Sequence, residues 1–149
     1  KPTAKMTKSY KVAFIVSEYH NELTKSMENA CRKELIRLGI AKKQIDSFYA
    51  PGSWEIPVIA QKVAKTKKYT GIAAFGVILK GDTYHFEMIA NEVGKALMQV
   101  SLTHDIPIAM EVLAVYTLAQ AKKRTSGEHN KGTEAAQALI KAIDTLTSI

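Results

Sequence analysis

Apolar and polar positions alternate along this chain in an order typical of strands followed by helices. Four short runs, at residues 11–17, 45–50, 72–79 and 106–112, are rich in β-branched and other apolar side chains. Runs of this kind, apolar on both faces, are typical of parallel strands buried within a sheet. The run 72–79 is the most apolar of the four and is expected to be a central strand.

The segments between these runs show the three- and four-residue spacing of helices. This spacing predicts a helix over residues 22–38, one that begins near Pro57 and carries Ala60 and Val63, and one with apolar positions from 86 to 100. Two more are expected over 117–124 and 133–146. Gly39 suits the C-cap of the first helix, and residues 81–83 suit a turn and an N-cap for the third.

Strands that alternate with helices in this way predict an α/β fold, a three-layer αβα sandwich with a four-stranded parallel sheet of the flavodoxin-like kind. The chain has 149 residues, of which 46% are apolar, enough for one core and too few for two domains. We expect residues 10–149 to form a single domain and residues 1–9 to form a flexible tail. In such folds ligands bind beyond the carboxyl ends of the strands.

Charge and composition narrow the class of ligand. The net charge is +7, from 21 Lys and Arg against 14 Asp and Glu, and the lysines are scattered singly or in pairs. This scatter favours a small anionic ligand, or a role in solubility alone, over nucleic acid, which needs a basic stripe with interleaved aromatic residues. The single cysteine, Cys31, excludes a disulfide framework and a Cys-rich zinc site, and indicates a cytoplasmic protein. The longest apolar stretch is too short to cross a bilayer, so no membrane partner is expected.

The residues that follow the strands could carry chemistry together. Tyr19 and Trp54 offer aromatic faces, Glu55 a carboxylate for hydroxyl groups, and His85 a base in the first turn of a helix. Local sequence alone leaves simpler interpretations open: Trp54 could anchor the core, and residues 81–83 could be an ordinary capped turn. The methionines, at positions such as 27, 88, 98 and 110, have the spacing of core residues, and Cys31 has no base nearby in sequence.

Longer motifs add a resemblance to a known family. Residues 51–57 (PGSWEIP), residues 76–87 (GVILKGDTYHFE), the pair Asn91-Glu92 and residues 130–136 closely resemble the 6,7-dimethyl-8-ribityllumazine synthase family. The motifs occur in the family's order and spacing, over about residues 11–146. The resemblance implies condensation of 5-amino-6-(D-ribitylamino)uracil with 3,4-dihydroxy-2-butanone 4-phosphate, with release of phosphate and water, a step of riboflavin biosynthesis. It also implies no metal or organic cofactor, and sites between the subunits of a homopentamer.

Matched position by position, the resemblance also implies roles for individual residues. Tyr19 stands where the family has an aromatic that stacks on the pyrimidine. His20, the next residue, is also expected to bind substrate, although the family usually has Asn at this position. The segment Ser53, Trp54 and Glu55 matches the part that holds the ribityl chain, and the backbone of Val77, Ile78 and Leu79 matches the part that reads the pyrimidine edge.

The remaining matches concern the second substrate and the chemistry. Asp82 and Thr83 match the phosphate turn, and Arg124 matches an arginine that binds phosphate. His85 matches the proposed proton-transfer histidine. Met110 matches a position that a neighbouring subunit contributes against the ring.

Some residues depart from the family pattern. The family usually has Asn at position 20, Arg at 80, Gly at 111 and an acidic residue at 123, where this chain has His20, Lys80, Glu111 and Lys123. These departures keep an alternative in view, a non-catalytic protein of the same fold that binds flavin or lumazine. The presence of Thr83, His85 and Arg124 together favours the enzyme. An association with riboflavin synthase and assembly of pentamers into decamers or shells stay open.

Overall fold

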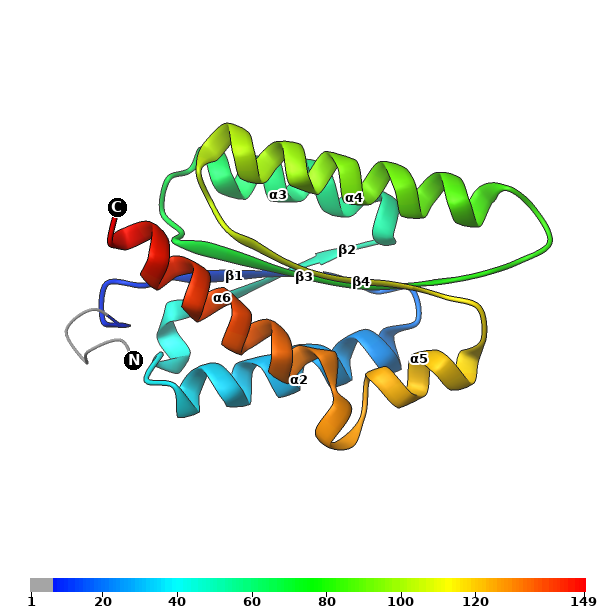
Figure 1. The fold of residues 1–149 in the computed structure, drawn as a ribbon, viewed down its shortest axis with the longest axis horizontal. Coiled ribbons are helices and arrows are strands. Elements are labelled where there is room, and N and C mark those ends of the chain that lie inside the picture. The colour runs from blue at the N-terminus through cyan, green and yellow to red at the C-terminus, as the bar shows by residue number, and fades with distance from the viewer. Residues whose placement is uncertain (1–6) are drawn as a thin grey trace.

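The computed structural model describes residues 7–149, which form one sheet between two layers of helices (Figure 1). The strands are β1 (Val12–Ser17), β2 (Ile45–Ala50), β3 (Gly71–Leu79) and β4 (Ile108–Val115). They pair in parallel in the order β2-β1-β3-β4. The predicted four-stranded parallel sheet is therefore confirmed, and β3 is an internal strand as expected.

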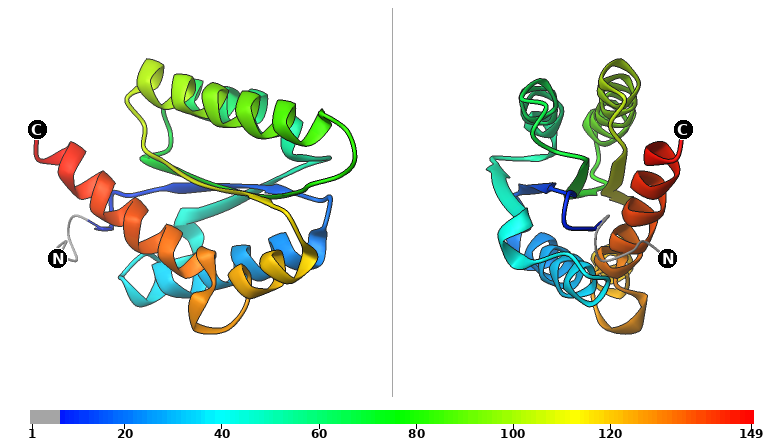
Figure 2. Two further views of the ribbon diagram at one scale, coloured as in Figure 1. Left: turned by 45° about the vertical axis from the view of Figure 1, so that its right-hand side comes forward. Right: turned by 90° about the vertical axis from the view of Figure 1, so that its left-hand side faces the viewer.

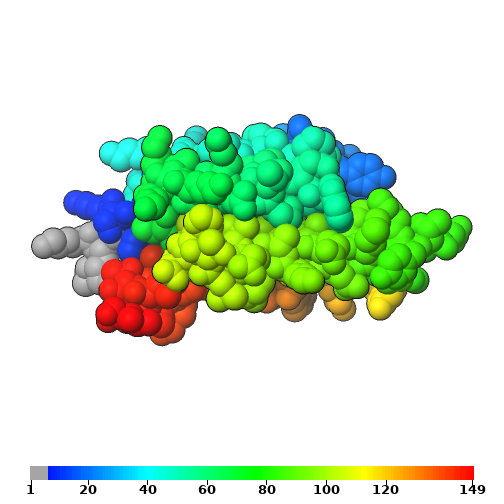
Figure 3. All heavy atoms as spheres, turned by 90° about the horizontal axis from the view of Figure 1, so that it is seen from above, coloured from blue at the N-terminus to red at the C-terminus, as the bar shows by residue number. Residues whose placement is uncertain are grey.

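Helices cover both faces of the sheet, which confirms the three-layer architecture. Helices α3 (Ile56–Lys65) and α4 (His85–His104) lie on one face, and α2 (Asn21–Arg37), α5 (Leu118–Arg124) and α6 (Lys131–Thr147) lie on the other (Figures 1 and 2). Figure 3 looks onto the outer surface of α3 and α4 and shows that the two helices lie side by side. Three short 3-10 helices complete the described chain: η1 (Lys42–Gln44), η2 (Ser53–Glu55) and η3 (Gly127–His129).

Alternation along the strands divides the core into two halves. Phe14 and Phe75 point toward α2 and α6, where their rings meet edge to face with centroids 5.5 Å apart. Ile15 and Ile72 point the other way, toward α3 and α4. Because β1 and β3 are buried on both faces, they read as continuous apolar runs in the sequence.

The helix ends agree with the sequence signals at some places and correct them at others. Gly39, in the left-handed region at φ 105°, directly follows the C-cap of α2 and supplies the conformation predicted for it. The expected cap at residues 81–83 is wrong. Helix α4 begins at His85, and its N-cap Tyr84 makes no side-chain capping bond. The Thr83 hydroxyl instead accepts a weak bond from the His85 backbone N–H at 3.4 Å.

Strand β4 differs from its predicted range of 106–112 at both ends. It runs from Ile108 to Val115, because pairing with β3 continues to the contact between Leu79 and Val115. Glu111 lies inside the strand in both the predicted and the observed range, and its side chain is on the face that packs against α6. The Glu111 side chain is only partly buried at this position.

Three further expectations can be compared with the structure. Met27 is buried as predicted, but the core assignment is wrong for Met88, Met98 and Met110, which are exposed. Most of the predicted tail, residues 1–6, lies outside the described residues; Thr7 is buried, and its carbonyl accepts a bond from the Gln44 side chain at 2.6 Å. None of the helices within residues 7–149 combines the length and the apolar character that a bilayer crossing requires.

Candidate active site

A pocket of about 750 Å³ opens at the carboxyl ends of β1 and β3, on the side of α3 and α4. This is the place where parallel α/β sheets bind ligands. Nine of the residues singled out in the sequence line it: Tyr19, His20, Ser53, Trp54, Glu55, Val77, Ile78, Leu79 and His85.

The wall formed by η2 depends on a close approach to β3. Ser53 is buried against Gly76, and a Cβ added at Gly76 would lie only 2.5 Å from the Ser53 Oγ. A glycine at this point of β3 therefore lets η2 lie on the strand. Trp54 is 52% exposed and lines the pocket, so the interpretation of Trp54 as a core anchor is wrong. Glu55 lies beside it, half-buried.

Tyr19 and His20 form the wall at the end of β1. The Tyr19 ring is 67% exposed and meets the His20 ring edge to face, with centroids 4.5 Å apart. His20 has φ 58° and ψ 46°, in the left-handed region, and precedes the first residue of α2. Among residues other than glycine, Asn, Asp and His adopt this region most readily. The backbone therefore accounts for a histidine where the resembling family usually has asparagine.

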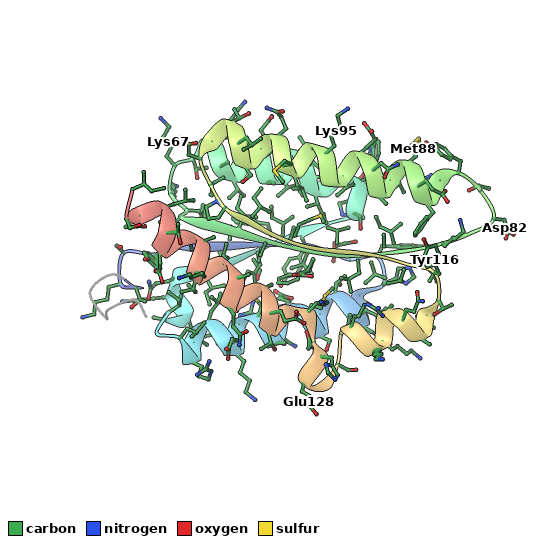
Figure 4. The ribbon with its side chains drawn as sticks, in the orientation of Figure 1. Lys67, Asp82, Met88, Lys95, Tyr116 and Glu128 are labelled. Atoms are coloured by element: carbon green, nitrogen blue, oxygen red, sulfur yellow. The ribbon has the colours of Figure 1, made fainter. Side chains whose placement is uncertain are left out.

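The segment from β3 to α4 brings the imidazole to the pocket. The Lys80 backbone N–H donates to the Val115 carbonyl at 2.9 Å, and the Lys80 ammonium pairs with Glu87 at 2.8 Å. Gly81 and His85 line the pocket on either side of the turn. Asp82 and Thr83 do not line it: both are exposed, and Asp82 lies at the outer end of the loop (Figure 4).

Two predicted site residues lie elsewhere on the chain. Met110 is on the edge strand β4 and is 46% exposed. Arg124 ends α5, in the helical layer on the opposite face of the sheet, and its Nη1 donates to the Gln120 carbonyl at 3.1 Å. Neither side chain lines the pocket of its own chain.

Sequence reasoning also missed part of the lining. Met88 and Ile89 face the pocket from α4, three and four residues after His85. This is the spacing at which helical side chains share a face, and it could have identified them. Pro51, Gly52, Lys80 and Gly81 complete the lining.

Two buried titratable groups lie outside the pocket. Burial raises the pKa of the Cys31 thiol, which agrees with the expectation that Cys31 is not a nucleophile. Burial also raises the pKa of Glu111 to about 7; the Lys131 ammonium opposes this change, and the Glu134 carboxylate adds to it. Cys31 belongs to α2, and both groups lie between the sheet and the layer of α2 and α6.

The pocket has the parts needed to hold a planar ring and a polyol beside a base. Tyr19 and Trp54 offer ring faces, the end of β3 offers backbone groups, and Glu55 can accept bonds from hydroxyl groups. His85, which is exposed, offers an imidazole to the pocket, and an imidazole can both donate and accept protons. Such a pocket fits chemistry in which two small substrates are held together while protons move.

Comparison with known proteins identifies the family. The sequence profile of 6,7-dimethyl-8-ribityllumazine synthase matches residues 9–147. A 6,7-dimethyl-8-ribityllumazine synthase of Leuconostoc mesenteroides is 35% identical over 140 residues, which cover 93% of this chain and 90% of the relative. The enzyme of Albidiferax ferrireducens is 35% identical over 95% of this chain and 88% of the relative. The enzyme of Coxiella burnetii is 33% identical over 95% of this chain and 94% of the relative. These findings favour the enzyme over the non-catalytic alternative, and this chain belongs to the 6,7-dimethyl-8-ribityllumazine synthase family of riboflavin biosynthesis.

Proposed function

We propose that this chain condenses 5-amino-6-(D-ribitylamino)uracil with 3,4-dihydroxy-2-butanone 4-phosphate in the pocket described above. The observation that carries the proposal is that nine residues, matched to the family one by one, line a single pocket with His85 at its rim. They come from four separate segments of the chain, so their meeting is not a consequence of sequence proximity.

The ribitylamino-uracil fits the inner part of the pocket. Tyr19 stacks on the pyrimidine, and the backbone of residues 77–79 hydrogen-bonds to the edge of the ring. Ser53, Trp54 and Glu55 hold the ribityl chain, with Glu55 accepting from its hydroxyl groups. His20 lies beside Tyr19 in the same wall of the pocket and binds the same substrate.

The phosphate substrate requires residues that a single chain holds apart. The turn with Asp82 and Thr83 presents backbone N–H groups beside the start of α4, which attract an anion. We propose that Arg124 of an adjacent subunit neutralises the phosphate and that Met110 of an adjacent subunit packs against the ring. The exposed position of Met110 on an edge strand supports this arrangement. A closed homopentamer would then supply each pocket with these side chains.

The reaction needs proton transfers more than a strong nucleophile. The 5-amino group of the uracil attacks the ketone, and a first water leaves to give an imine. Phosphate is then eliminated to leave an enol, which tautomerises to a ketone. The ribityl-bearing nitrogen attacks this ketone, and loss of a second water closes the ring. His85 is placed at the rim to move protons during these steps. Much of the rate comes from holding two substrates together, so loss of His85 should slow turnover without abolishing it. A cytoplasmic location and an association with riboflavin synthase stay predictions.

The test is formation of the lumazine, followed by absorbance, after the purified protein is mixed with both substrates. We expect His85→Ala to lower kcat by about 100-fold or more while some product still forms. We expect Arg124→Ala to raise the KM of the butanone phosphate by at least about tenfold. Tight binding of the ribitylamino-uracil without any product would contradict the proposal and would point to a binding protein.

A further inference from the structure

The backbone that follows Arg124 is anchored by two side chains. Thr125, the next residue, is 2% exposed. Its carbonyl accepts a bond from the Ser26 hydroxyl at 2.5 Å and another from the Asn130 Nδ2 at 2.9 Å. Ser26 lies in the second turn of α2, and Asn130 directly precedes α6. One side chain from α2 and one from the N-cap of α6 therefore hold the carbonyl of the residue that follows the arginine.

Asn130 also joins this carbonyl to the start of α6. Its Oδ1 accepts from the Gly132 backbone N–H at 2.8 Å and so caps the helix, while its Nδ2 lies 3.4 Å from the Ser26 Oγ. Gly132 packs so closely on α2 that an added Cβ would lie 2.0 Å from the Met27 carbonyl oxygen. The segment from Thr125 to Gly132 is thus held against α2 at Ser26 and Met27.

Helix α5 is short, so its two ends determine where Arg124 lies. It has seven residues, and its first turn is closed by a capping box between Thr117 and Gln120. The Arg124 guanidinium donates to the Gln120 carbonyl, which orients the side chain along the helix. A guanidinium has five N–H donors, so this single bond, the one side-chain hydrogen bond of Arg124 among the described residues, leaves donors for an oxyanion.

We propose that Ser26 and Asn130 are positioning residues for Arg124. By holding the Thr125 carbonyl on α2, they fix the C-terminal end of α5 and the direction from which the guanidinium meets the phosphate of the substrate. This inference rests on the phosphate role proposed for Arg124. It assigns a part in phosphate binding to two side chains that do not line the pocket, one in α2 and one at the N-cap of α6.

Ser26→Ala tests the inference with little risk to folding, because alanine is the better helix former. We expect the KM of the butanone phosphate, and the inhibition constant of inorganic phosphate, to rise between about twofold and tenfold. The KM of the ribitylamino-uracil should stay within about twofold of its original value. Asn130→Asp keeps an acceptor that caps α6 and loses the amide donor, so it should act in the same direction.

Ser101→Ala is the matched control. The Ser101 hydroxyl, in the last turn of α4, donates to the Ile106 carbonyl at 2.6 Å, the same kind of bond at a place outside the pocket. This variant should leave both KM values and the phosphate inhibition constant unchanged. An equal rise in Ser101→Ala would show a general loss of structure and would overturn the inference.

A double-mutant cycle separates positioning from a merely structural effect. If Ser26 acts through Arg124, then Ser26→Ala should raise the phosphate inhibition constant no further in the Arg124→Ala background. Additive effects would overturn the inference. If Arg124→Ala affects phosphate binding but Ser26→Ala and Asn130→Asp do not, the inference fails and the proposed function stands. If Arg124→Ala has no effect, the phosphate role of Arg124 fails, and the inference fails with it.

Discussion

Gly76→Ala should disturb the pocket from beneath, without removing any group that contacts substrate. The added Cβ would lie 2.5 Å from the Ser53 Oγ, 3.3 Å from the Val112 Cγ1 and 3.4 Å from the Ile56 Cδ1. An unstrained contact needs roughly 3.5 Å, so the Ser53 hydroxyl must move by about 1 Å, and the two neighbours leave little room for the methyl group to shift. Overpacking of this kind costs about 1–3 kcal/mol of unfolding free energy.

The displacement should appear in both stability and substrate binding. We expect a Tm lower by roughly 2–4 °C for each kcal/mol lost, and a catalytic efficiency toward the ribitylamino-uracil lower by up to about 100-fold. The KM of the butanone phosphate should change much less. Gly94→Ala is the control. Gly94 lies in α4, and a Cβ added there would have open space around it, so this substitution should stabilise the helix slightly. A Gly76→Ala variant with unchanged Tm and KM would refute the role of Gly76 in placing η2.

Three further predictions concern single side chains. Glu111→Gln should remove a pH dependence of stability: the pKa of Glu111 is raised to about 7, so the folded state keeps a proton that the unfolded state has released. As the pH rises from about 4.5 to about 7, the unfolding free energy of the wild type should therefore fall by about 2 kcal/mol relative to that of the Gln variant. This value allows for the partial exposure of Glu111, and denaturant unfolding across that pH range would measure it. Glu55→Gln should raise the KM of the ribitylamino-uracil by about tenfold and leave that of the butanone phosphate unchanged, as steady-state kinetics would show. His20→Asn should keep the wild-type Tm, whereas His20→Val, a β-branched residue at φ 58°, should cost about 1–2 kcal/mol in thermal unfolding.

The sheet could be predicted because burial on both faces leaves a continuous apolar run. β3 is the clearest example, since eight of its nine residues are buried and its position in the sheet follows from that. The ends of β4 could not be predicted in the same way. They depend on pairing with β3 up to Leu79, which is a contact between segments distant in the sequence.

The pocket could be predicted for residues that directly follow a strand, because the carboxyl ends of parallel strands meet at one edge. Tyr19 and Trp54 are of this kind, and both line the pocket. The exposure of Met98 could not be predicted, because helical spacing alone does not show which helix face meets the sheet. The local sequence also could not predict that Arg124 lies away from the pocket, because this depends on which face of the sheet α5 covers.

The most direct test of a site shared between subunits is complementation between two impaired variants. His85→Ala and Arg124→Ala chains would be unfolded together, refolded as mixed assemblies and assayed for lumazine formation at butanone phosphate concentrations below KM. If each pocket takes His85 from one subunit and Arg124 from its neighbour, random mixing restores about a quarter of the sites. We predict activity well above the mean of the two variants assembled separately. Activity equal to that mean would contradict a shared site. It would mean either that His85 and Arg124 of one chain serve the same pocket, or that the two residues do not serve the same reaction.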